Sequence, residues 1–143
     1  MIGIVLFGHG NLSEELKRSV EMILGQQEVL YSLGVGPEEG EESIVTRLAS
    51  TIEKADRGEG VLLLTDMFGG TPMNMSCRYL EDTRVEVVTG INLAGLIKAL
   101  TARKEPVPLA ELAKQVAIHG KGDISVAGEL LRPDKATRKT DGT

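Results

Sequence analysis

The stretch Ile2-Gly-Ile-Val-Leu-Phe-Gly-His-Gly-Asn11 decides the fold, because it joins a continuous apolar run to a turn rich in glycine. Such a run is typical of a strand that is buried on both faces of a parallel sheet. Apolar residues then recur at spacings of three and four from Leu12 to Leu24, which predicts a helix with this stripe in the core. Ser13 is placed to cap the helix and Gly25 to end it.

The alternation of strand and helix continues along the chain. Four buried strands alternating with helices predict an α/β fold with one mostly parallel sheet and helices on both faces. A more exposed edge strand is expected last, so that residues 1–131 form a single domain and residues 132–143 a polar tail. The predicted strands after the first span residues 29–33, 61–65, 85–89 and 124–131, and the later helices span residues 43–55, 72–80, 93–103 and 109–117.

Composition places the chain among ordinary globular proteins and argues against several functions. Of its 143 residues, 41% are hydrophobic and 26% charged. The net charge of -5 argues against a nucleic-acid partner, since phosphate backbones are bound by an excess of Lys and Arg. Aromatic residues make up only 3%, which argues against stacking on bases or on a flavin ring. The one cysteine, Cys77, allows no internal disulfide and fits a reducing cytoplasm.

Three glycine-containing turns follow the first, third and fourth predicted strands, at residues 8–11, 66–71 and 90–93. Ligands of open α/β sheets bind beyond the carboxyl ends of the strands, where the strand order reverses. The three turns are therefore expected on one rim of the sheet. In a flavodoxin-like strand order the first and third strands are neighbours, so His9 and Asp66 are expected within reach of each other.

His9 has the features of a phosphoryl-accepting nucleophile. It ends a predicted strand, and Gly8 and Gly10 on either side leave little bulk in front of its ring. Because the ordinary pKa of a histidine side chain is about 6.5, a neutral and nucleophilic ring is available at physiological pH. A carboxylate such as Asp66 would hold the opposite ring N–H, fix the tautomer and stabilise the imidazolium that forms on attack.

The loop that carries Asp66 also offers an anion site. The backbone amides of Gly69, Gly70 and Thr71, followed by a helix with Pro72 at its first position, are predicted to form a nest for a phosphoryl group. The Thr71 hydroxyl, which also suits the helix N-cap, adds one donor. Each residue has a structural interpretation as well, since Asp66 could cap its loop and the glycines could satisfy tight backbone geometry.

Other chemistries lack their parts in this sequence. Neither a G-x-x-x-x-G-K-[ST] phosphate-binding loop nor a G-x-S-x-G nucleophile elbow occurs. Two isolated histidines and one cysteine give no metal-ligand spacing, so no metal site is expected. The second histidine, His119, is interpreted as a solvated residue near the end of the last helix.

Four segments occur in order along the chain: Gly8-His-Gly10, Glu21-Met-Ile-Leu-Gly-Gln26, Thr65-Asp-Met-Phe-Gly-Gly-Thr-Pro-Met-Asn74 and Thr89-Gly-Ile-Asn-Leu93. They resemble the motifs of the enzyme IIA component of the mannose-family phosphoenolpyruvate-dependent sugar phosphotransferase system. The resemblance covers roughly residues 1–130 without a large gap, and the segment after the third predicted strand is its most specific part.

The resemblance implies a phosphoryl carrier for sugar uptake. The family's phosphoryl-accepting histidine falls on His9, its orienting aspartate on Asp66 and its phosphoryl-contacting hydroxyl on Thr71. The donor would be the carrier protein HPr in its phosphohistidine form. The acceptor would be a histidine of enzyme IIB, expected on a separate chain, which serves a membrane complex of enzymes IIC and IID. Phe68 and Gly90 are expected to contact the phosphoryl group or these partners.

The same resemblance implies a cytoplasmic homodimer, peripherally associated with its transporter complex and with no metal or organic cofactor. Its subunits would exchange a C-terminal strand, matched here by residues 124–131. The sequence departs from the family at three positions. Some members carry a second hydroxyl where this chain has Met67, and this change bears on the phosphoryl site. Family proteins often carry a tryptophan where Phe68 stands and a proline where Ala94 stands, and neither change touches the chemistry.

Other functions also fit a site at this rim of the sheet. With the same chemistry, the chain could be a regulatory phospho-acceptor, or the phosphoryl carrier of dihydroxyacetone kinase, whose carrier domain resembles it in fold and histidine position. From a different class, it could be a flavodoxin-like module that binds a small anion or a nucleotide. Phosphoryl uptake on histidine, followed by transfer to an enzyme IIB, distinguishes these hypotheses.

Overall fold

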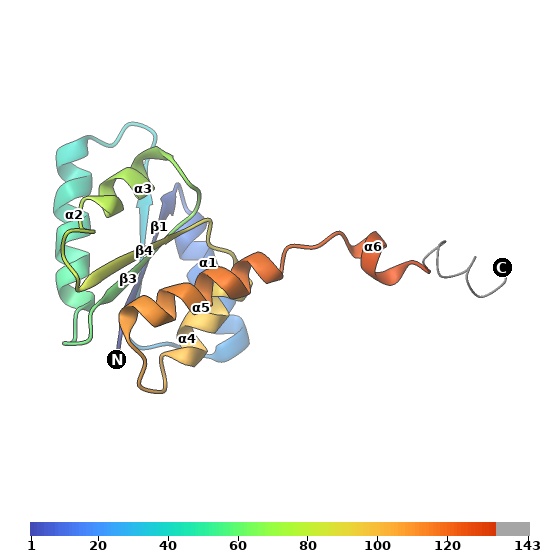
Figure 1. Ribbon diagram of the computed structural model, residues 1–143. Helices are drawn as coiled ribbons and strands as arrows, with labels where there is room; N and C mark the ends of the chain where they lie inside the picture. The colour runs from blue at the N-terminus through green and yellow to red at the C-terminus, as the bar shows by residue number, and fades with distance from the viewer. Residues whose placement is uncertain (134–143) are drawn as a thin grey trace.

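The chain folds around one four-stranded sheet, as Figure 1 shows for the computed structural model. All strands are parallel, and their order β2-β1-β3-β4 is the flavodoxin-like order that the sequence predicts. The structure describes residues 1–133, so most of the predicted polar tail lies outside the described residues. The strands are β1 (Gly3–His9), β2 (Leu30–Val35), β3 (Val61–Thr65) and β4 (Val85–Thr89).

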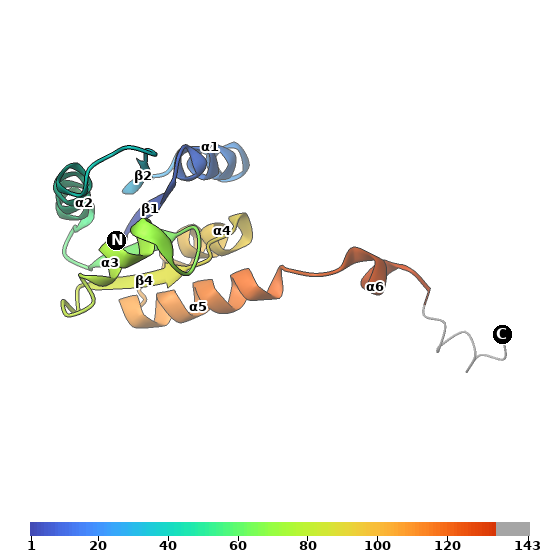
Figure 2. The same ribbon diagram turned by 90° about the horizontal axis from the view of Figure 1, so that it is seen from above.

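Helices cover both faces of the sheet, which confirms the predicted layers (Figure 2). Side chains of a strand alternate between the two faces, so β1 contributes to both cores. Ile4 and Leu6 pack in one core, and Val5 and Phe7 in the other. The first core is completed by α1 (Leu12–Leu24), α4 (Leu93–Ala102) and α5 (Leu109–Gly122), and the second by α2 (Glu41–Ala55) and α3 (Gly70–Cys77).

The strand register brings the ends of β1, β2 and β3 to one rim. Phe7 pairs with Thr65 on β3, so the residue after β3 lies beside the end of β1. On the other side Gly8 pairs with Gly34 of β2, and the Gly10 amide donates to the Val35 carbonyl at 3.0 Å. A Cβ at Gly34 would lie 2.0 Å from the Gly10 carbonyl oxygen, so only glycine permits this close approach of the turn after β1.

The start of α1 differs from the prediction. Ser13 does not cap the helix, because the N-cap is two residues earlier, at Asn11, and α1 begins at Leu12. The helix is rotated about its axis so that Ser13 and Val20 face the sheet and are buried. Leu12 and Ile23, which were predicted to lie in the core, are exposed. The predicted end of the helix is confirmed, since Gly25 follows it with φ +85°, a left-handed conformation that favours glycine.

The predicted bounds of α3 are wrong at both ends. Gly69 and Gly70, with φ +110° and +81°, turn the chain early, so α3 begins at Gly70 and Thr71 is not its N-cap. Pro72 is therefore the third residue of the helix, where its missing N–H still costs no intrahelical bond. The helix ends at Cys77 instead of residue 80, because the chain continues in short turns closed by bonds to the residue three positions back.

The predicted C-terminal strand is also wrong. Residues 124–126 have no regular structure, and Ala127–Leu131 form the short helix α6, which projects away from the sheet (Figures 1 and 2). A strand is stabilised by hydrogen bonds to a neighbouring backbone, and this segment lies against none in the single chain. Its exposed apolar side chains are Ile124, Val126, Leu130 and Leu131.

Candidate functional site

His9 and Asp66 meet at the rim of the sheet, as the sequence predicts. The His9 ring nitrogen Nδ1 lies 2.8 Å from Asp66 Oδ2, and the His9 backbone amide donates to the same oxygen at 2.8 Å. A carboxylate can only accept, so the ring proton belongs on Nδ1 and the other ring nitrogen, Nε2, carries a lone pair. The His9 side chain is 49% exposed, so Nε2 belongs to an accessible nucleophile.

Glycine at position 8 makes room for the Asp66 carboxylate. A Cβ at Gly8 would lie 3.0 Å from Asp66 Oδ2 and 2.9 Å from Ser13 Oγ, closer than side chains normally approach. Any larger residue would therefore push the carboxylate away from the His9 ring. Gly10 is needed for a different reason, because its φ of +58° lies in the left-handed region and turns the chain out of β1.

The Asp66 carboxyl is held in its ionised form. Burial alone would raise its pKa, because charge is disfavoured away from water. The hydrogen bonds from the His9 backbone and side chain act in the opposite direction and outweigh burial, so the pKa of Asp66 lies below its usual value. The carboxylate can therefore orient the ring and stabilise the positive charge that develops when the ring is alkylated or phosphorylated.

The second nitrogen of the ring faces the start of α3. A Cβ at Gly70 would lie 3.1 Å from His9 Nε2 and 3.1 Å from Cε1, so the ring packs directly against this glycine. Gly70 and Thr71 are the first two residues of α3, whose amides have no acceptor in the preceding turn of the helix. An anion bonded to Nε2 would therefore meet backbone donors and the positive end of a helix.

Two members of the predicted phosphoryl cradle are placed differently from the prediction. The Gly69 amide donates to the Met73 sulfur at 3.1 Å, so in this conformation it is not directed at His9. The Thr71 side chain is exposed and lines a groove of about 310 Å³ together with Ile44 and Arg78. No hydrogen bond joins its hydroxyl to His9 within the part of the chain that the structure describes.

Exposed apolar residues lie in the same loop. Phe68 is 81% exposed and Met67 is 52% exposed, so two consecutive large apolar side chains are open to solvent here. Gly90 lies at the end of β4, beside β3, and has φ +77°. The next amide, that of Ile91, donates to the Thr65 carbonyl at 3.0 Å, which fastens this turn to the same rim.

The structure also shows features that the sequence did not indicate. A groove of about 610 Å³ adjoins the turn after β1, with Gly10 and Asn11 on one side and the α2 residue Arg47 on the other. Its walls come from segments far apart in the sequence, so no local pattern could predict it. Ser13 was predicted as a cap, and instead its side chain is buried beside Gly8 and Asp66. A serine within an otherwise apolar helix face was the available signal.

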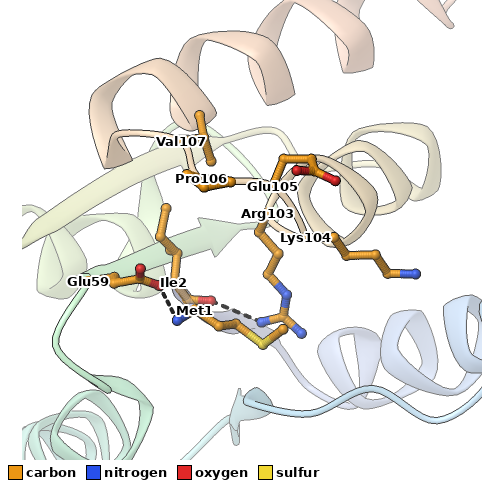
Figure 3. Close-up of a pocket in the computed structure, with 8 residues that line it drawn as sticks. All are labelled: Met1, Ile2, Glu59, Arg103, Lys104, Glu105, Pro106 and Val107. Carbon is orange, nitrogen blue, oxygen red and sulfur yellow. Dashed lines mark hydrogen bonds and ion pairs between the residues drawn. The ribbon is translucent and has the colours of Figure 1, made fainter.

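A smaller pocket, of about 180 Å³, lies at the opposite, amino end of the sheet (Figure 3). Its wall includes Arg103, whose guanidinium donates to the Ile2 carbonyl, and the amino group of Met1, which pairs with Glu59. The lining contains no histidine or cysteine nucleophile. Within residues 1–133 no cluster of three His, Cys, Asp or Glu side chains could hold a metal ion.

Comparison with known proteins shows the family of this chain. Residues 3–117 match the family model EIIA-man, described as the PTS system fructose IIA component. The mannose-specific EIIAB component of Escherichia coli is 35% identical over 112 residues, which is 78% of this chain and 35% of that protein. The fructose-specific EIIA component of Bacillus subtilis is 29% identical over 97% of this chain and 95% of its own length.

A solved structure has a similar fold. The phosphotransferase system component EIIA from Streptococcus agalactiae superposes with a TM-score of 0.82 at 26% sequence identity, covering 90% of this chain and 99% of that one.

The chain belongs to the EIIA family of the mannose type in the phosphotransferase system, since the family model spans most of its length. It spans about a third of the length of the mannose-specific EIIAB relatives that it matches. None of the helices within residues 1–133 combines the length and the apolar character needed to cross a membrane.

Proposed function

We propose that this protein carries a phosphoryl group on His9, accepting it from phosphorylated HPr and passing it to an enzyme IIB for sugar uptake. The observation that carries the proposal is the double contact of the ring. Nδ1 is held by Asp66 at 2.8 Å, and Nε2 packs against the glycine that begins α3. This arrangement is what a nucleophile needs in order to take up an anion while its other nitrogen keeps its proton.

The reaction is an in-line exchange between two imidazoles. The lone pair of His9 Nε2 attacks phosphorus, the bond from phosphorus to the donor histidine breaks, and the donor ring keeps that electron pair. The proton on Nδ1 stays in its bond to Asp66, so the positive charge of the phosphorylated ring is paired with a carboxylate. Because the donor before transfer and His9 after transfer are both phosphohistidines, the driving force is small and the protein contributes by positioning and by charge stabilisation.

The phosphoryl oxygens would bind at the start of α3. The amides of Gly70 and Thr71 supply backbone donors there, and the helix dipole favours the negative charge. The Thr71 hydroxyl joins them after rotation of an exposed side chain, which requires no change in the core. Met67 stands where some family members carry a second hydroxyl, so the backbone supplies a larger share of the donors in this chain.

Both protein partners must reach the same rim. Phe68 and Met67 are exposed beside His9 and form the apolar centre of the proposed contact surface. A carrier that meets two partners in turn needs a small and transient interface, for which a few apolar side chains around an accessible ring suffice. We place the protein in the cytoplasm, where it would serve the membrane complex of enzymes IIC and IID through enzyme IIB.

We also propose a homodimer. The side chains of Ile124, Val126, Leu130 and Leu131 are exposed in the single chain, on a segment that projects from the domain. β4 is at the edge of the sheet, and a groove of about 370 Å³ lies between it and α5, lined in part by Val87 and Ala113. A second copy would cover both apolar surfaces.

Phosphoryl uptake tests the proposal directly. The protein is incubated with phosphoenolpyruvate, enzyme I and HPr, and the product is expected to be an acid-labile, alkali-stable phosphate that then passes to an enzyme IIB. His9→Ala should abolish the label, whereas the matched control His119→Ala, at an exposed histidine of α5, should retain it. Label that survives in His9→Ala, or no uptake by the unaltered protein, would contradict the proposal.

A further inference from the structure

The carboxylate that orients His9 is only half satisfied. Asp66 Oδ2 accepts from both the amide and the ring of His9, each at 2.8 Å. The other oxygen, Oδ1, is buried and has no hydrogen-bond partner within the described residues. A buried carboxylate oxygen without a donor is costly, so a further donor is expected close to it.

Ser13 brings a hydroxyl close to this carboxylate, because both would contact a Cβ built on Gly8. Its side chain is only 3% exposed although it stands in the first turn of α1. The helix does not use Ser13 as its cap, because Asn11 holds the N-cap position. A buried hydroxyl that is not engaged in capping is available for a neighbouring acceptor.

Gly8 shows that Ser13 and Asp66 share one small space. A Cβ built on Gly8 would be 2.9 Å from Ser13 Oγ, 3.0 Å from Asp66 Oδ2 and 3.2 Å from Asp66 Cγ. Because Ser13 Oγ and the Asp66 carboxylate both lie within 3.2 Å of that one point, a rotation of the Ser13 side chain or one bridging water can join the hydroxyl to the carboxylate. The missing side chain of Gly8 keeps this space open.

We propose that the Ser13 hydroxyl donates to Asp66 Oδ1, directly or through one bridging water, and is a positioning residue for His9. With both oxygens engaged, the carboxylate plane cannot rotate, and Oδ2 stays aligned with the ring nitrogen Nδ1. The ring is then fixed with Nε2 toward Gly70 before the phosphoryl donor arrives. This role in transfer rests on the proposed function, whereas the contact with Asp66 does not.

Two variants separate the hydroxyl from its volume. Ser13→Ala removes the donor, and Ser13→Cys keeps a side chain of similar size with a much weaker donor. Both should raise the pKa of the Asp66 carboxyl by about one unit, because a donor to the charged form is lost. His9 is the one titratable group that the structure shows acting on this carboxyl, and it is unchanged in both. The readout is a carbon-13 NMR titration of the unphosphorylated protein.

The same variants should slow phosphoryl transfer from phospho-HPr by about fivefold at an unchanged KM, since positioning affects the step after binding. Ser76→Ala is the matched control. Ser76 is an equally buried serine whose hydroxyl has no partner among the described residues, but it lies on α3, which packs on the other face of the sheet. This control should leave the pKa of Asp66 unchanged.

The outcomes are distinct. The proposal is wrong if the pKa of Asp66 in Ser13→Ala or in Ser13→Cys equals its value in the unaltered protein. It is also wrong if Ser76→Ala raises this pKa by the same amount as Ser13→Ala. An unaltered protein that takes up no phosphoryl group would instead contradict the proposed function, and the NMR titration would still decide the contact between Ser13 and Asp66.

Discussion

The two ends of the sheet hold their charged groups in opposite ways. At the carboxyl end, Asp66 has one side-chain partner, His9, whose ring is half exposed. At the amino end, Arg103 is only 5% exposed and donates to the backbone carbonyls of Ile2, Val29 and Glu28. Burial lowers the pKa of Arg103 from its usual value, because a buried guanidinium loses its hydration.

This difference separates chemistry from stability. The Arg103 guanidinium fastens the N-terminal strand and the segment before β2, where Val29 adopts φ +51°, a strained conformation for a β-branched residue. Its hydrogen-bond partners are backbone carbonyl groups, which do not titrate. The His9 ring keeps one nitrogen accessible, so it can gain and lose a substituent. Changes at Arg103 should therefore lower the free energy of unfolding, and changes at Asp66 should lower the rate of phosphoryl transfer.

The largest expected effect is at the amino end. Arg103→Met removes the guanidinium donor from three carbonyl groups, of which that of Ile2 is buried and those of Val29 and Glu28 are half-buried, and should lower the free energy of unfolding by about 3 kcal/mol. Urea denaturation followed by circular dichroism measures the loss. Lys104→Met, at the exposed neighbouring residue, is the control and should change the free energy of unfolding by less than about 0.5 kcal/mol. If the two variants were equally stable, Arg103 would not fasten this end.

The next effect is at the carboxyl end and should appear in rate instead of stability. Asp66→Asn replaces the carboxylate by a neutral amide that cannot stabilise the imidazolium, and it should slow phosphoryl uptake about 100-fold. Rapid-quench kinetics with phospho-HPr give the rate. The free energy of unfolding should fall by less than about 1 kcal/mol, since the amide oxygen of asparagine can still accept from the His9 backbone amide. Asp123→Asn, an exposed residue after α5, should match the unaltered protein, and an unchanged rate in Asp66→Asn would remove this residue from the mechanism.

Alanine substitutions at two glycines, one at each end of the sheet, compare the effect of backbone changes on stability and on phosphoryl uptake. Gly58, in the loop before β3, and Gly70 both have positive φ, at +102° and +81°. Alanine at either position should cost about 1 kcal/mol of stability. Only Gly70→Ala should also slow phosphoryl uptake, by about tenfold, because its Cβ would lie 3.1 Å from His9 Nε2, whereas Gly58 has open space around it. Equal uptake rates in the two variants would show that Nε2 does not face α3 during transfer.

The smallest effect concerns acid stability at the amino end. Hydrogen bonds from the Arg84 side chain and the Gly58 amide lower the pKa of Asp56 to about 2. A pKa lower in the folded state contributes stability above the ordinary value of about 3.9, and this is lost as pH falls through about 2. Because Arg84 is half exposed, the contribution is less than about 1 kcal/mol. Asp56→Asn should therefore flatten the stability profile below pH 4, and an unaltered slope would contradict this.

Local patterns were sufficient to predict the sheet and the pairing of His9 with Asp66 at its rim. The apolar runs and glycine turns predicted the parallel strands, and the flavodoxin-like order predicted that His9 and Asp66 would meet. Patterns failed where packing between elements or the geometry of a loop determines how a group is oriented. The burial of Ser13 depends on the rotation of α1 against the sheet, and the Gly69 amide turns toward Met73 because of the loop's own geometry.

The C-terminal segment shows the same limit. Its apolar residues 124–131 suggested a strand, but a strand needs a neighbouring backbone, and in the single chain the segment ends as the helix α6. A sequence pattern indicates which side chains need burial and leaves open which surface buries them.

Identifying the phosphorylated ring nitrogen tests the central claim most directly. Nitrogen-15 NMR of the histidine rings, recorded on protein phosphorylated through HPr, distinguishes a phosphoryl group on Nε2 from one on Nδ1. With Nδ1 held by Asp66, the account predicts phosphorylation of His9 at Nε2, with the Nδ1 proton retained. A phosphoryl group on Nδ1 of His9, or on any other residue, would contradict it.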